Sequence, residues 1–446
     1  MRFEIPDNVS YIIKTLNHAG YEAYAVGGCV RDMILGRIPQ DWDITTSALP
    51  EAVKRLFRRT VDTGIKHGTV TVLTRGRQYE VTTFRVDGNY KDGRHPENVT
   101  FTRCLSEDLL RRDFTVNAMA YHPDEGIVDL HGGMDDIRNR IIRAVGDPDA
   151  RFDEDALRIM RAVRFAAQLD FDIEPETLAA ISRHAPRLDM ISCERIQAEL
   201  TKLLISPHPE KILVLYDCCI TARILPVFDA MMKLEQHNPF HSYSVGIHTV
   251  KMLENIEADP ILRWTALLHD SGKTLTHTRD EGGCDHFYGH GQASAQLADE
   301  VLHRLRFDNN TIAKVTTLIR YHDYRFSMTK KNLRKVISMV SPELFPLLMD
   351  VMRADNLAKS PLAVSKLIPA LDDLQKLYEE ILEEGDCLTL KDLAVNGGDL
   401  ISAGMKPGPK MGSVLKDMFE TVLEDPGKNE KELLMQLFKD RIADSP

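Results

Sequence analysis

The stretch that decides the fold near the N-terminus is Gly27–Asp32, GGCVRD, together with Asp41–Pro50, DWDITTSALP. The apolar residues Tyr24–Val26 before it predict a short strand, and Val30–Leu35 predicts a helix of one or two turns. Glycines between a strand and a helix let the backbone approach a phosphate group, and the helix N-terminus offers free N–H groups. Arg31 adds a fork of hydrogen-bond donors. The first part of the stretch is therefore a candidate phosphate-binding turn.

Two aspartates, Asp41 and Asp43, characterise the second part of the stretch. If a strand covers Asp41–Thr45, both carboxylates point the same way, about 7 Å apart along the chain, and Trp42 faces the other way. Two carboxylates at one edge suit Mg²⁺, and a pair of ions about 3.5–4 Å apart can serve in-line nucleotidyl transfer. A D-x-D pattern alone is more often a solvated strand edge. Combined with the glycine turn, it favours a Mg²⁺ site at Asp41 and Asp43.

Composition and charge are those of a soluble globular protein of several domains. The chain has 446 residues, 43% of them hydrophobic and 28% charged, and a formal net charge of −11. No apolar run is long enough to span a membrane, and the seven cysteines include no C-x-x-C pair. We therefore expect a reduced, cytoplasmic protein without a membrane segment. The acidic total argues against nonspecific coating of nucleic acid but leaves room for a local basic groove.

Residues 1–145 mix strand and helix signals, whereas the rest of the chain is patterned as helices. Alternating β-branched residues predict neighbouring strands at Lys66–Thr74 and Tyr79–Arg85, and the polar, glycine-rich Gly88–Asn98 is typical of a loop. The expected helical segments include 153–169, 174–184 and 193–204. The candidate boundaries are 207–209, 280–285 and 396–412. We expect an α+β fold, in which a mixed N-terminal domain precedes an all-helical remainder.

The quoted stretch resembles the first motif of the DNA-polymerase-beta-like nucleotidyltransferases. Its form of this motif is similar to that of the bacterial class II CCA-adding tRNA nucleotidyltransferases and of their relatives, the poly(A) polymerases. Three further segments resemble later motifs of the family: Arg111–Met119 (RRDFTVNAM), Arg151–Arg158 (RFDEDALR) and Ser192–Ile196 (SCERI). The resemblance is continuous over about residues 20–205.

The resemblance implies four parts. These are a nucleotidyltransferase head at 1–145, a helical neck at 146–206 for nucleotide selection and RNA binding, a helical body at 207–360 with an HD-type domain, and a helical tail at 361–446 that binds tRNA. It also implies that Asp41 and Asp43 hold Mg²⁺. The residues implied to bind ATP or CTP are Gly28, Arg31, Arg112, Asp155, Arg158, Arg161 and Arg164.

The segment Glu154–Ala167 (EDALRIMRAVRFAA) is the part of the neck that could read a base. On one continuous helix, Asp155 and Arg158 are neighbours about 4.5 Å apart along the axis, and Arg161 and Arg164 continue a basic stripe. Spacing alone favours the alternative of an exposed helix with one ion pair and a solvated arginine face. The position of this segment directly after the nucleotidyltransferase motifs favours a role in nucleotide recognition.

The implied activity is template-independent addition and repair of the 3′-terminal CCA of tRNA from CTP and ATP, with release of pyrophosphate. The partners would be the acceptor stem and 3′ end of tRNA, with no obligate protein partner. The segment Thr63–Val70 resembles the CCA-adding version, and the loop between Val86 and Asp108 favours complete addition. The nearest alternatives are a poly(A) polymerase and a partial adder that adds only CC or only A. From another class, an HD-type phosphohydrolase with an RNA-clamping head stays open, whereas the paired Asp41 and Asp43 argue against a catalytically silent RNA-binding protein.

The helical part contains a second set of candidate ligands, His248, His269, Asp270 and Asp355, arranged as in the HD phosphohydrolase superfamily. His290 and His322 would extend the set to a second metal ion. Imidazole with carboxylate suits Mn, Fe, Ni or Zn better than Mg. The alternative is a scaffold whose buried histidines have only structural partners.

Overall fold

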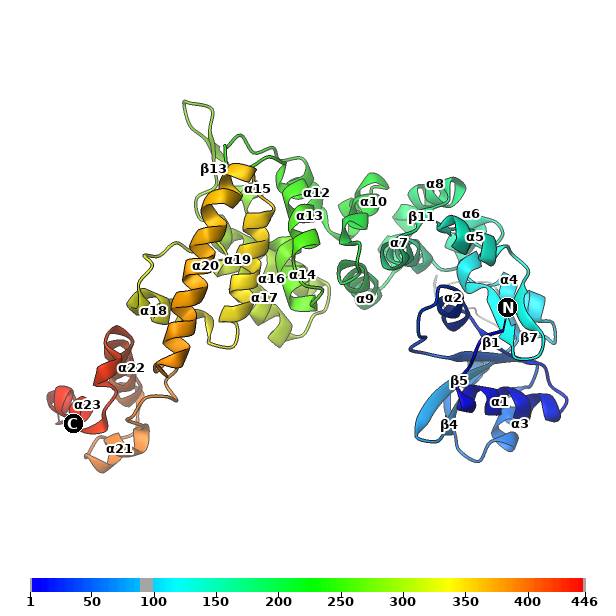
Figure 1. Ribbon diagram of the computed structural model, residues 1–446, viewed down its shortest axis with the longest axis horizontal. Helices are drawn as coiled ribbons and strands as arrows, with labels where there is room; N and C mark the ends of the chain where they lie inside the picture. Colours follow the sequence, from blue (N-terminus) through cyan, green and yellow to red (C-terminus); the bar gives the residue numbers. More distant parts are fainter. Residues whose placement is uncertain (1, 89–98, 444–446) are drawn as a thin grey trace. The chain divides into compact units, whose positions relative to one another are not determined.

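The structure is a computed structural model that describes residues 2–88 and 99–443. The chain divides into two compact units, residues 1–226 and 227–446. Figure 1 shows the first unit in blue to green and the second in green to red. The predicted α+β fold is confirmed, since a mixed head is followed by helices.

A seven-stranded sheet forms the centre of the head, in the order β3-β4-β5-β2-β1-β8-β9. Its strands are β1 (Ala23–Val26), β2 (Asp43–Thr46), β3 (Thr60–Gly64), β4 (Thr69–Thr74), β5 (Arg77–Thr83), β8 (Met119–His122) and β9 (Gly126–Asp129). Strand β2 pairs with β1 antiparallel and with β5 parallel. This pairing puts β2 inside the sheet, with hydrogen-bonded neighbours on both sides. Two short strands, β6 (Arg85–Asp87) and β7 (Val99–Phe101), form a separate ribbon.

The helices of the head pack their apolar faces against this sheet. The first of them, α1, buries Val9, Ile12, Ile13 and Leu16, which recur at helical spacing, and it packs on β1. The helix α2 starts where the glycine turn ends, as the sequence predicts. The head helices are α1 (Asp7–His18), α2 (Gly28–Ile34), α3 (Pro50–Leu56), α4 (Leu105–Leu110) and α5 (Gly133–Asn139).

The neck consists of helices, but the expected continuous helix over 153–169 is wrong. Helix α6 ends at Glu154, and α7 begins at Leu157, because Asp155 adopts an extended backbone with φ −140° and ψ 104°. The Asp155 carboxylate accepts the N–H of Leu157 at 2.9 Å and so caps the second helix. The helices of the predicted neck are α6 (Pro148–Glu154), α7 (Leu157–Leu169), α8 (Pro175–His184) and α9 (Cys193–Leu204). Helices α10 (Ile212–Asp217) and α11 (Thr221–Ile224) follow in the same compact unit.

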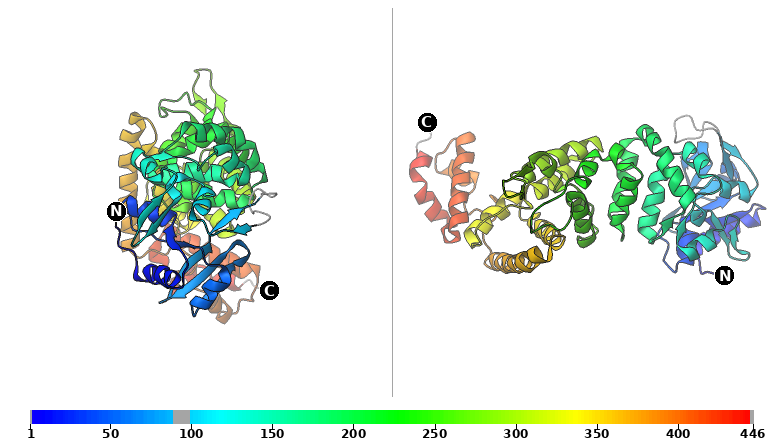
Figure 2. Two further views of the ribbon diagram at one scale, coloured as in Figure 1. Left: turned by 90° about the vertical axis from the view of Figure 1, so that its right-hand side faces the viewer. Right: turned by 90° about the horizontal axis from the view of Figure 1, so that it is seen from above.

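The second unit is built almost entirely from helices (Figures 1 and 2). Helices α17 to α20 enclose one apolar cluster, and α21 to α23 enclose another. The helices are α12 (Pro226–Met232), α13 (Val245–Asn255), α14 (Pro260–Leu268), α15 (Lys273–Thr276), α16 (His290–Arg304), α17 (Asn309–Tyr321), α18 (Lys330–Val340), α19 (Phe345–Leu357), α20 (Pro361–Glu383), α21 (Gly397–Ser402), α22 (Pro409–Glu424), α23 (Lys431–Leu437) and α24 (Lys439–Ala443).

Two short strand pairs correct the expectation of an all-helical remainder. Strands β10 (Ile141–Ile142) and β11 (Asp172–Ile173) pair in parallel, and β12 (Thr278–Arg279) and β13 (Asp285–His286) form a hairpin. The sequence predicts a boundary at residues 280–285. In the structure, residues 280–284 connect the two strands of the hairpin, and Asp285 begins β13. Most of the expected loop, residues 89–98, lies outside the described residues. In the described chain, no helix is long and apolar enough to cross a membrane.

Candidate functional site

Asp43 is the first residue of β2, and strand pairing fixes its neighbours. It lies opposite Val26, the last residue of β1, and opposite Glu80 of β5. Its side chain stays open to solvent. Asp41 precedes the strand, so the expectation of one strand carrying both aspartates is wrong. On the β1 side, the neighbouring strand ends at Val26, opposite Asp43, so no β1 residue is left to pair with Asp41.

Negative charges gather around Asp43. Burial by surrounding atoms raises the pKa of Asp43, the Arg112 guanidinium opposes this rise, and the carboxylates of Glu80 and Asp41 add to it. Carboxylates that repel one another beside an open position form an oxygen-rich donor set of the kind that Mg²⁺ binds. Asp41 and Glu80 thus lie near enough to act on the charge of Asp43, although in the described residues the three carboxylates do not bring oxygen atoms within 4.8 Å of one another. Asp41 and Asp43 stay the predicted Mg²⁺ ligands.

Glu80 is a candidate that the sequence reasoning missed. It lies in the segment Tyr79–Arg85, whose β-branched alternation predicts only a strand. The parallel register of β5 with β2 brings Glu80 beside Asp43. That register depends on a non-local strand pairing, so no local pattern in the sequence indicates it.

The glycine turn lies between two arginines. Gly27 has φ 84°, and a Cβ atom built there would lie 3.2 Å from Nη1 of Arg112. A Cβ on Gly28 would lie 3.6 Å from Nη2 of Arg31. The absence of side chains at both glycines therefore keeps the turn open toward two guanidinium groups, a suitable environment for a phosphate chain.

Arg31 is held in place from two sides. Its Nε and Nη2 atoms donate to Asp32 at 2.9 and 2.8 Å, and its Nη1 atom donates to Asn117 at 2.6 Å. Asn117 belongs to the predicted second motif, Arg111–Met119, so two of the sequence motifs meet at this guanidinium.

The arginines of α7 are anchored rather than solvated. Arg161 donates a hydrogen bond to Asp113. Burial alone would raise the pKa of Asp113, but the positive charge of Arg161 lowers this pKa to about 2. Arg164 pairs with Glu199 at 2.9 Å. Arg158 and Arg164 are only 8% and 7% exposed, so the alternative of a solvated arginine face is wrong for these two residues.

Three guanidiniums converge on one aromatic ring. The Cζ atoms of Arg31, Arg161 and Arg164 lie 5.3, 5.3 and 4.0 Å from the ring centroid of Phe165. Phe165 is itself buried. The ring thus links Arg31, beside the glycine turn of the head, to Arg161 and Arg164, two predicted nucleotide-binding residues of the neck.

Asp155 and Arg158 do not pair with each other as adjacent helical positions would. Arg158 pairs with Glu154 at 2.5 Å and donates to the backbone carbonyls of Arg111 and Arg151, each at 3.0 Å. Asp155 instead accepts from Arg195. The helix break explains this change of partners, because it turns Asp155 out of the helical register on which the predicted pair depends.

The body brings the second set of candidate ligands together. The Nε2 atom of His248 lies 3.0 Å from Asp355 Oδ1 and 3.6 Å from Asp270 Oδ2. The Nε2 atom of His269 lies 3.1 Å from Asp270 Oδ2 and 3.8 Å from Asp355 Oδ1. Two imidazole nitrogens and two carboxylate oxygens therefore face a common centre.

A second group shares Asp270. Its other oxygen, Oδ1, lies 3.4 Å from His290 Nε2 and 3.7 Å from His322 Nε2. In the described residues, three side chains in each group offer donor atoms within 4.8 Å of one another. Two lysines neutralise the carboxylates from outside: Lys273 Nζ lies 2.7 Å from Asp270 Oδ2, and Lys359 Nζ lies 2.6 Å from Asp355 Oδ2.

The four histidines of this cluster are oriented alike. Each has its Nδ1 atom against a backbone carbonyl: His248 on Ala358 at 3.2 Å, His269 on Ala266 at 2.8 Å, His290 on Phe287 at 2.9 Å and His322 on Ile319 at 2.7 Å. If Nδ1 carries the proton, each Nε2 keeps a lone pair that a metal ion can accept. The buried Nε2 of His269 has no hydrogen-bond partner, which is the behaviour expected of a metal ligand.

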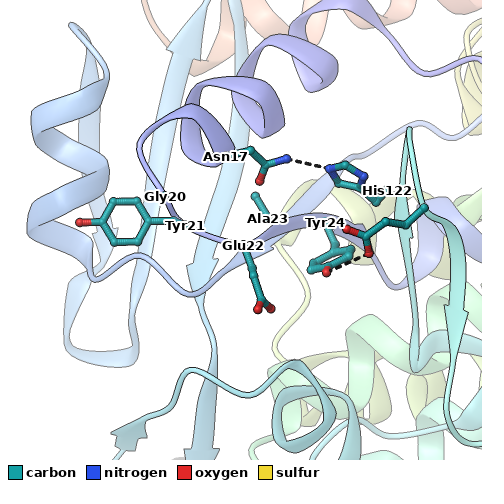
Figure 3. A pocket seen from close by; sticks show the side chains of 8 residues that line it. Asn17, Gly20, Tyr21, Glu22, Ala23, Tyr24 and His122 are labelled. Atoms are coloured by element: carbon teal, nitrogen blue, oxygen red, sulfur yellow. Dashed lines mark hydrogen bonds between the residues drawn. The ribbon is translucent and has the colours of Figure 1, made fainter.

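A pocket of about 350 Å³ lies elsewhere in the head, around the start of β1 (Figure 3). Its lining includes Tyr24, which donates to Glu125 at 3.2 Å, and Asn17, which bonds His122 at 2.7 Å. It contains none of the predicted site residues, because these gather where β1 ends. The pocket is therefore separate from the site at the glycine turn.

Three segments match family models. Residues 23–143 match the poly A polymerase head domain, 170–232 match the probable RNA and SrmB-binding site of polymerase A, and 290–438 match the putative domain 2 of tRNA nucleotidyltransferases. The head and its site are thus of the nucleotidyltransferase class that poly(A) polymerases represent.

Comparison with whole chains makes the family specific. The chain is 38% identical to the CCA-adding enzyme of Levilactobacillus brevis, over 96% of both chains, and 35% identical to that of Streptococcus agalactiae, over 97% of this chain and 96% of that one. The crystal structure of the Bacillus stearothermophilus CCA-adding enzyme with CTP matches with a TM-score of 0.71 and 31% identity, over 98% of this chain and 99% of that one. The chain belongs to the CCA-adding enzyme family. The predicted family and enzyme class are thereby confirmed.

The fold is also shared with more distant members. The Thermotoga maritima CCA-adding enzyme complexed with tRNA-CCA matches with a TM-score of 0.56 and 21% identity, over 97% of this chain and 95% of that one. The HD-type assignment of the body and the four-part division of the chain stay predictions.

Proposed function

We propose that this protein adds and repairs the 3′-terminal CCA of tRNA, using CTP and ATP and releasing pyrophosphate without a nucleic-acid template. The observation that carries the proposal is the carboxylate group Asp41, Asp43 and Glu80 beside a glycine turn that two arginines flank. Relatives that match nearly the whole chain are CCA-adding enzymes, and solved relatives hold CTP or tRNA. A cytoplasmic location, as expected from the sequence, belongs to the same proposal.

A divalent cation at this edge would be held through carboxylate oxygens of Asp41 and Asp43, with Glu80 as the neighbour of Asp43 on β5. Bound there, Mg²⁺ would activate the 3′-hydroxyl of the tRNA and stabilise charge on the transferred phosphoryl group. Arg31 and Arg112 provide fixed positive charge for the triphosphate on the two sides of the turn.

Base selection is assigned to Asp155 and Arg158. Cytosine and adenine both present an exocyclic amino donor next to a ring nitrogen that accepts. Each oxygen of Asp155 already accepts one hydrogen bond, from Leu157 N–H or from Arg195, and a carboxylate oxygen can accept a second. Arg158 can donate to the ring nitrogen only by exchanging one of its present partners.

One assay tests this proposal. Labelled tRNA that ends before CCA is incubated with CTP, ATP or both, and the products are resolved at single-nucleotide length. Two cytidines followed by one adenosine are expected. A long adenosine tail would identify a poly(A) polymerase, and addition of CC or A alone would identify a partial adder.

The ligand cluster of the body supports a second candidate function, a metal-dependent phosphohydrolase. One transition-metal ion would bind His248, His269, Asp270 and Asp355, and a second would bind Asp270, His290 and His322. A metal ion held in this way activates water for attack on a phosphate ester. The supporting observation is the common orientation of the four imidazoles toward the two carboxylates.

Elemental analysis of the purified protein, combined with hydrolysis of phosphomonoester and 2′,3′-cyclic nucleotide substrates, tests the second function. One or two equivalents of Mn, Fe, Ni or Zn and a hydrolytic rate that a chelator abolishes are expected. A protein that takes up no metal ion after incubation with these metals would leave the cluster with a scaffold role only.

A further inference from the structure

Asp108 is a fully buried carboxylate in α4, and it is not among the predicted site residues. Its Oδ1 atom accepts from Arg111 Nε at 3.0 Å and Nη2 at 2.6 Å. Its Oδ2 atom accepts from Arg112 Nη2 at 3.2 Å and from Thr45 Oγ1 at 3.1 Å. Burial would raise the pKa of Asp108, but the charges of Arg112 and Arg111 lower it, so the carboxylate stays ionised.

Arg112 lies between two carboxylates. On one side it donates to Asp108, and on the other its charge acts on Asp43. Its Nη1 atom borders the turn at Gly27, and its buried Nε atom has no hydrogen-bond partner. The guanidinium therefore has donors left for a phosphate group while one of its nitrogens is held by Asp108.

Thr45 connects Asp108 to the strand that carries Asp43. Thr45 and Asp43 are alternate residues of β2, and the Thr45 hydroxyl is within hydrogen-bond distance of Asp108. The bond sets α4, and with it Arg112, at a defined position relative to Asp43. Asp108 is the acceptor common to the strand and to the arginine.

We propose that Asp108 is a positioning residue that holds the Arg112 guanidinium toward the phosphate-binding turn and away from the carboxylate of Asp43. The inference rests on the proposed nucleotidyl transfer at this site. Without the negative charge of Asp108, Arg112 is drawn to Asp43, where it competes with the divalent cation for the same oxygen atoms. The triphosphate loses an oriented cation at the same time.

The test compares Asp108→Asn with the wild-type full-length chain. In Asp108→Asn we expect the Mg²⁺ concentration for half-maximal CTP incorporation to rise about fivefold or more. The KM for both CTP and ATP should rise about tenfold, whereas kcat at saturating Mg²⁺ and nucleotide should stay within about threefold. Mn²⁺ affinity, measured by electron paramagnetic resonance of the free ion, should fall by a similar factor. Only the Mn²⁺ sites that Asp43→Asn abolishes are counted, because the body cluster can also bind Mn²⁺.

The double variant Asp108→Asn with Arg112→Gln separates positioning from structural support. Removing the released guanidinium should return Mn²⁺ affinity to within about twofold of wild type, while the nucleotide KM stays high. Mn²⁺ affinity that stays as low as in the single variant would overturn the proposal. Asp108→Glu, which keeps the charge, should retain Mn²⁺ affinity. A loss in Asp108→Glu as large as in Asp108→Asn would show that the shape of the side chain matters rather than its charge, and would overturn the proposal.

Asp136→Asn is the matched control, since Asp136 is also buried in the head and also binds a threonine and an arginine, Thr115 and Arg143. It should leave the Mg²⁺ requirement unchanged. A wild-type Mg²⁺ requirement and wild-type KM in folded Asp108→Asn would also overturn the proposal. Because Mn²⁺ binding is read without turnover, failure of the proposed nucleotidyl transfer would be seen separately, as absence of incorporation by the wild-type protein.

Discussion

Asp155 Oδ2 accepts a hydrogen bond from Arg195 Nη2 at 2.7 Å, which joins the break between α6 and α7 to the start of α9. The other carboxylate oxygen accepts the N–H of Leu157 at 2.9 Å. With one bond on each oxygen, the plane of the carboxylate is fixed before a nucleotide arrives. Arg195 belongs to the Ser192–Ile196 motif, and under the proposed base selection it would act on the base through Asp155.

Base discrimination should therefore depend on both members of this pair. Asp155→Ala should reduce the preference for CTP over UTP by about a hundredfold, since uracil presents O4 where the carboxylate requires a donor. Arg195→Ala should reduce it by a smaller factor, because Asp155 stays present but is no longer held. Single-nucleotide incorporation with all four triphosphates measures both effects. Arg223→Ala removes a surface pair with Asp189 and is the control. Full CTP/UTP discrimination in Asp155→Ala would refute base reading by this residue.

Asp41→Asn and Asp43→Asn should each lower incorporation of both nucleotides by about a thousandfold or more, because each removes an anionic ligand. Glu80→Gln should lower it by about tenfold or more. Without Mg²⁺, the melting temperature of Asp43→Asn should be equal to or slightly above that of wild type, since one of several repelling charges is lost. Near-wild-type incorporation by either aspartate variant would show that the metal assignment is wrong.

Phe165→Leu should raise the KM for CTP and ATP together by about three- to tenfold. The substitution keeps an apolar side chain but removes the ring that three guanidiniums face, and each such interaction contributes about 0.5–1 kcal/mol or more. The preference between bases should not change. Phe345→Leu, a buried substitution against Tyr378 in the second unit, controls for a general loss of stability. A change in base preference without a change in KM would contradict this role.

The Asp113–Arg161 pair should stabilise the first unit at neutral pH and lose its effect in acid. The pKa of Asp113 lies at about 2 in the folded protein against 3.8 normally. The ionised Asp113 carboxylate therefore contributes roughly 2 kcal/mol to the free energy of unfolding. This contribution is fully present above about pH 4 and is lost as the pH falls through 2. Urea unfolding between pH 2 and 7 measures it. Asp113→Asn should abolish this part of the pH dependence, whereas the exposed Asp135→Asn should retain it.

His269→Ala with Asp270→Ala should remove metal from the body and leave CCA addition largely intact. The two sites use different side chains in different compact units of the chain. Metal stoichiometry and tRNA extension, measured on the same preparation, test this. Collapse of CCA addition in a folded double variant would refute the independence of the two sites.

Local patterns in the sequence predicted the parts of the site that lie close together along the chain. The glycine turn, Arg31 and the two aspartates fall within one short stretch, and helix α9 matches its predicted bounds, 193–204. The four predicted ligands of the body come from well-separated positions, and their pattern was found only through the resemblance to a superfamily. What local patterns could not predict depends on tertiary pairing.

Three features that the sequence reasoning did not predict illustrate this dependence on tertiary pairing. Glu80 reaches Asp43 only through the parallel pairing of β5 with β2. The helix break at Asp155 arises because its side chain bonds a following N–H, which competes with the helical backbone at a position that apolar spacing alone makes helical. Asp108 shows no local signal, since its role depends on Thr45 and Arg112 meeting at one buried point.

The neck is hydrogen-bonded to the head at three places, at the second motif and at the residue before it. Arg151 donates to the carbonyl of Leu110, Arg158 donates to the carbonyl of Arg111, and Arg161 pairs with Asp113. These bonds tie α6 and α7 to the segment that leads from α4 toward β8 of the sheet. While they persist, a switch from accepting cytosine to accepting adenine at the proposed site requires side-chain rotation or movement of the growing RNA end.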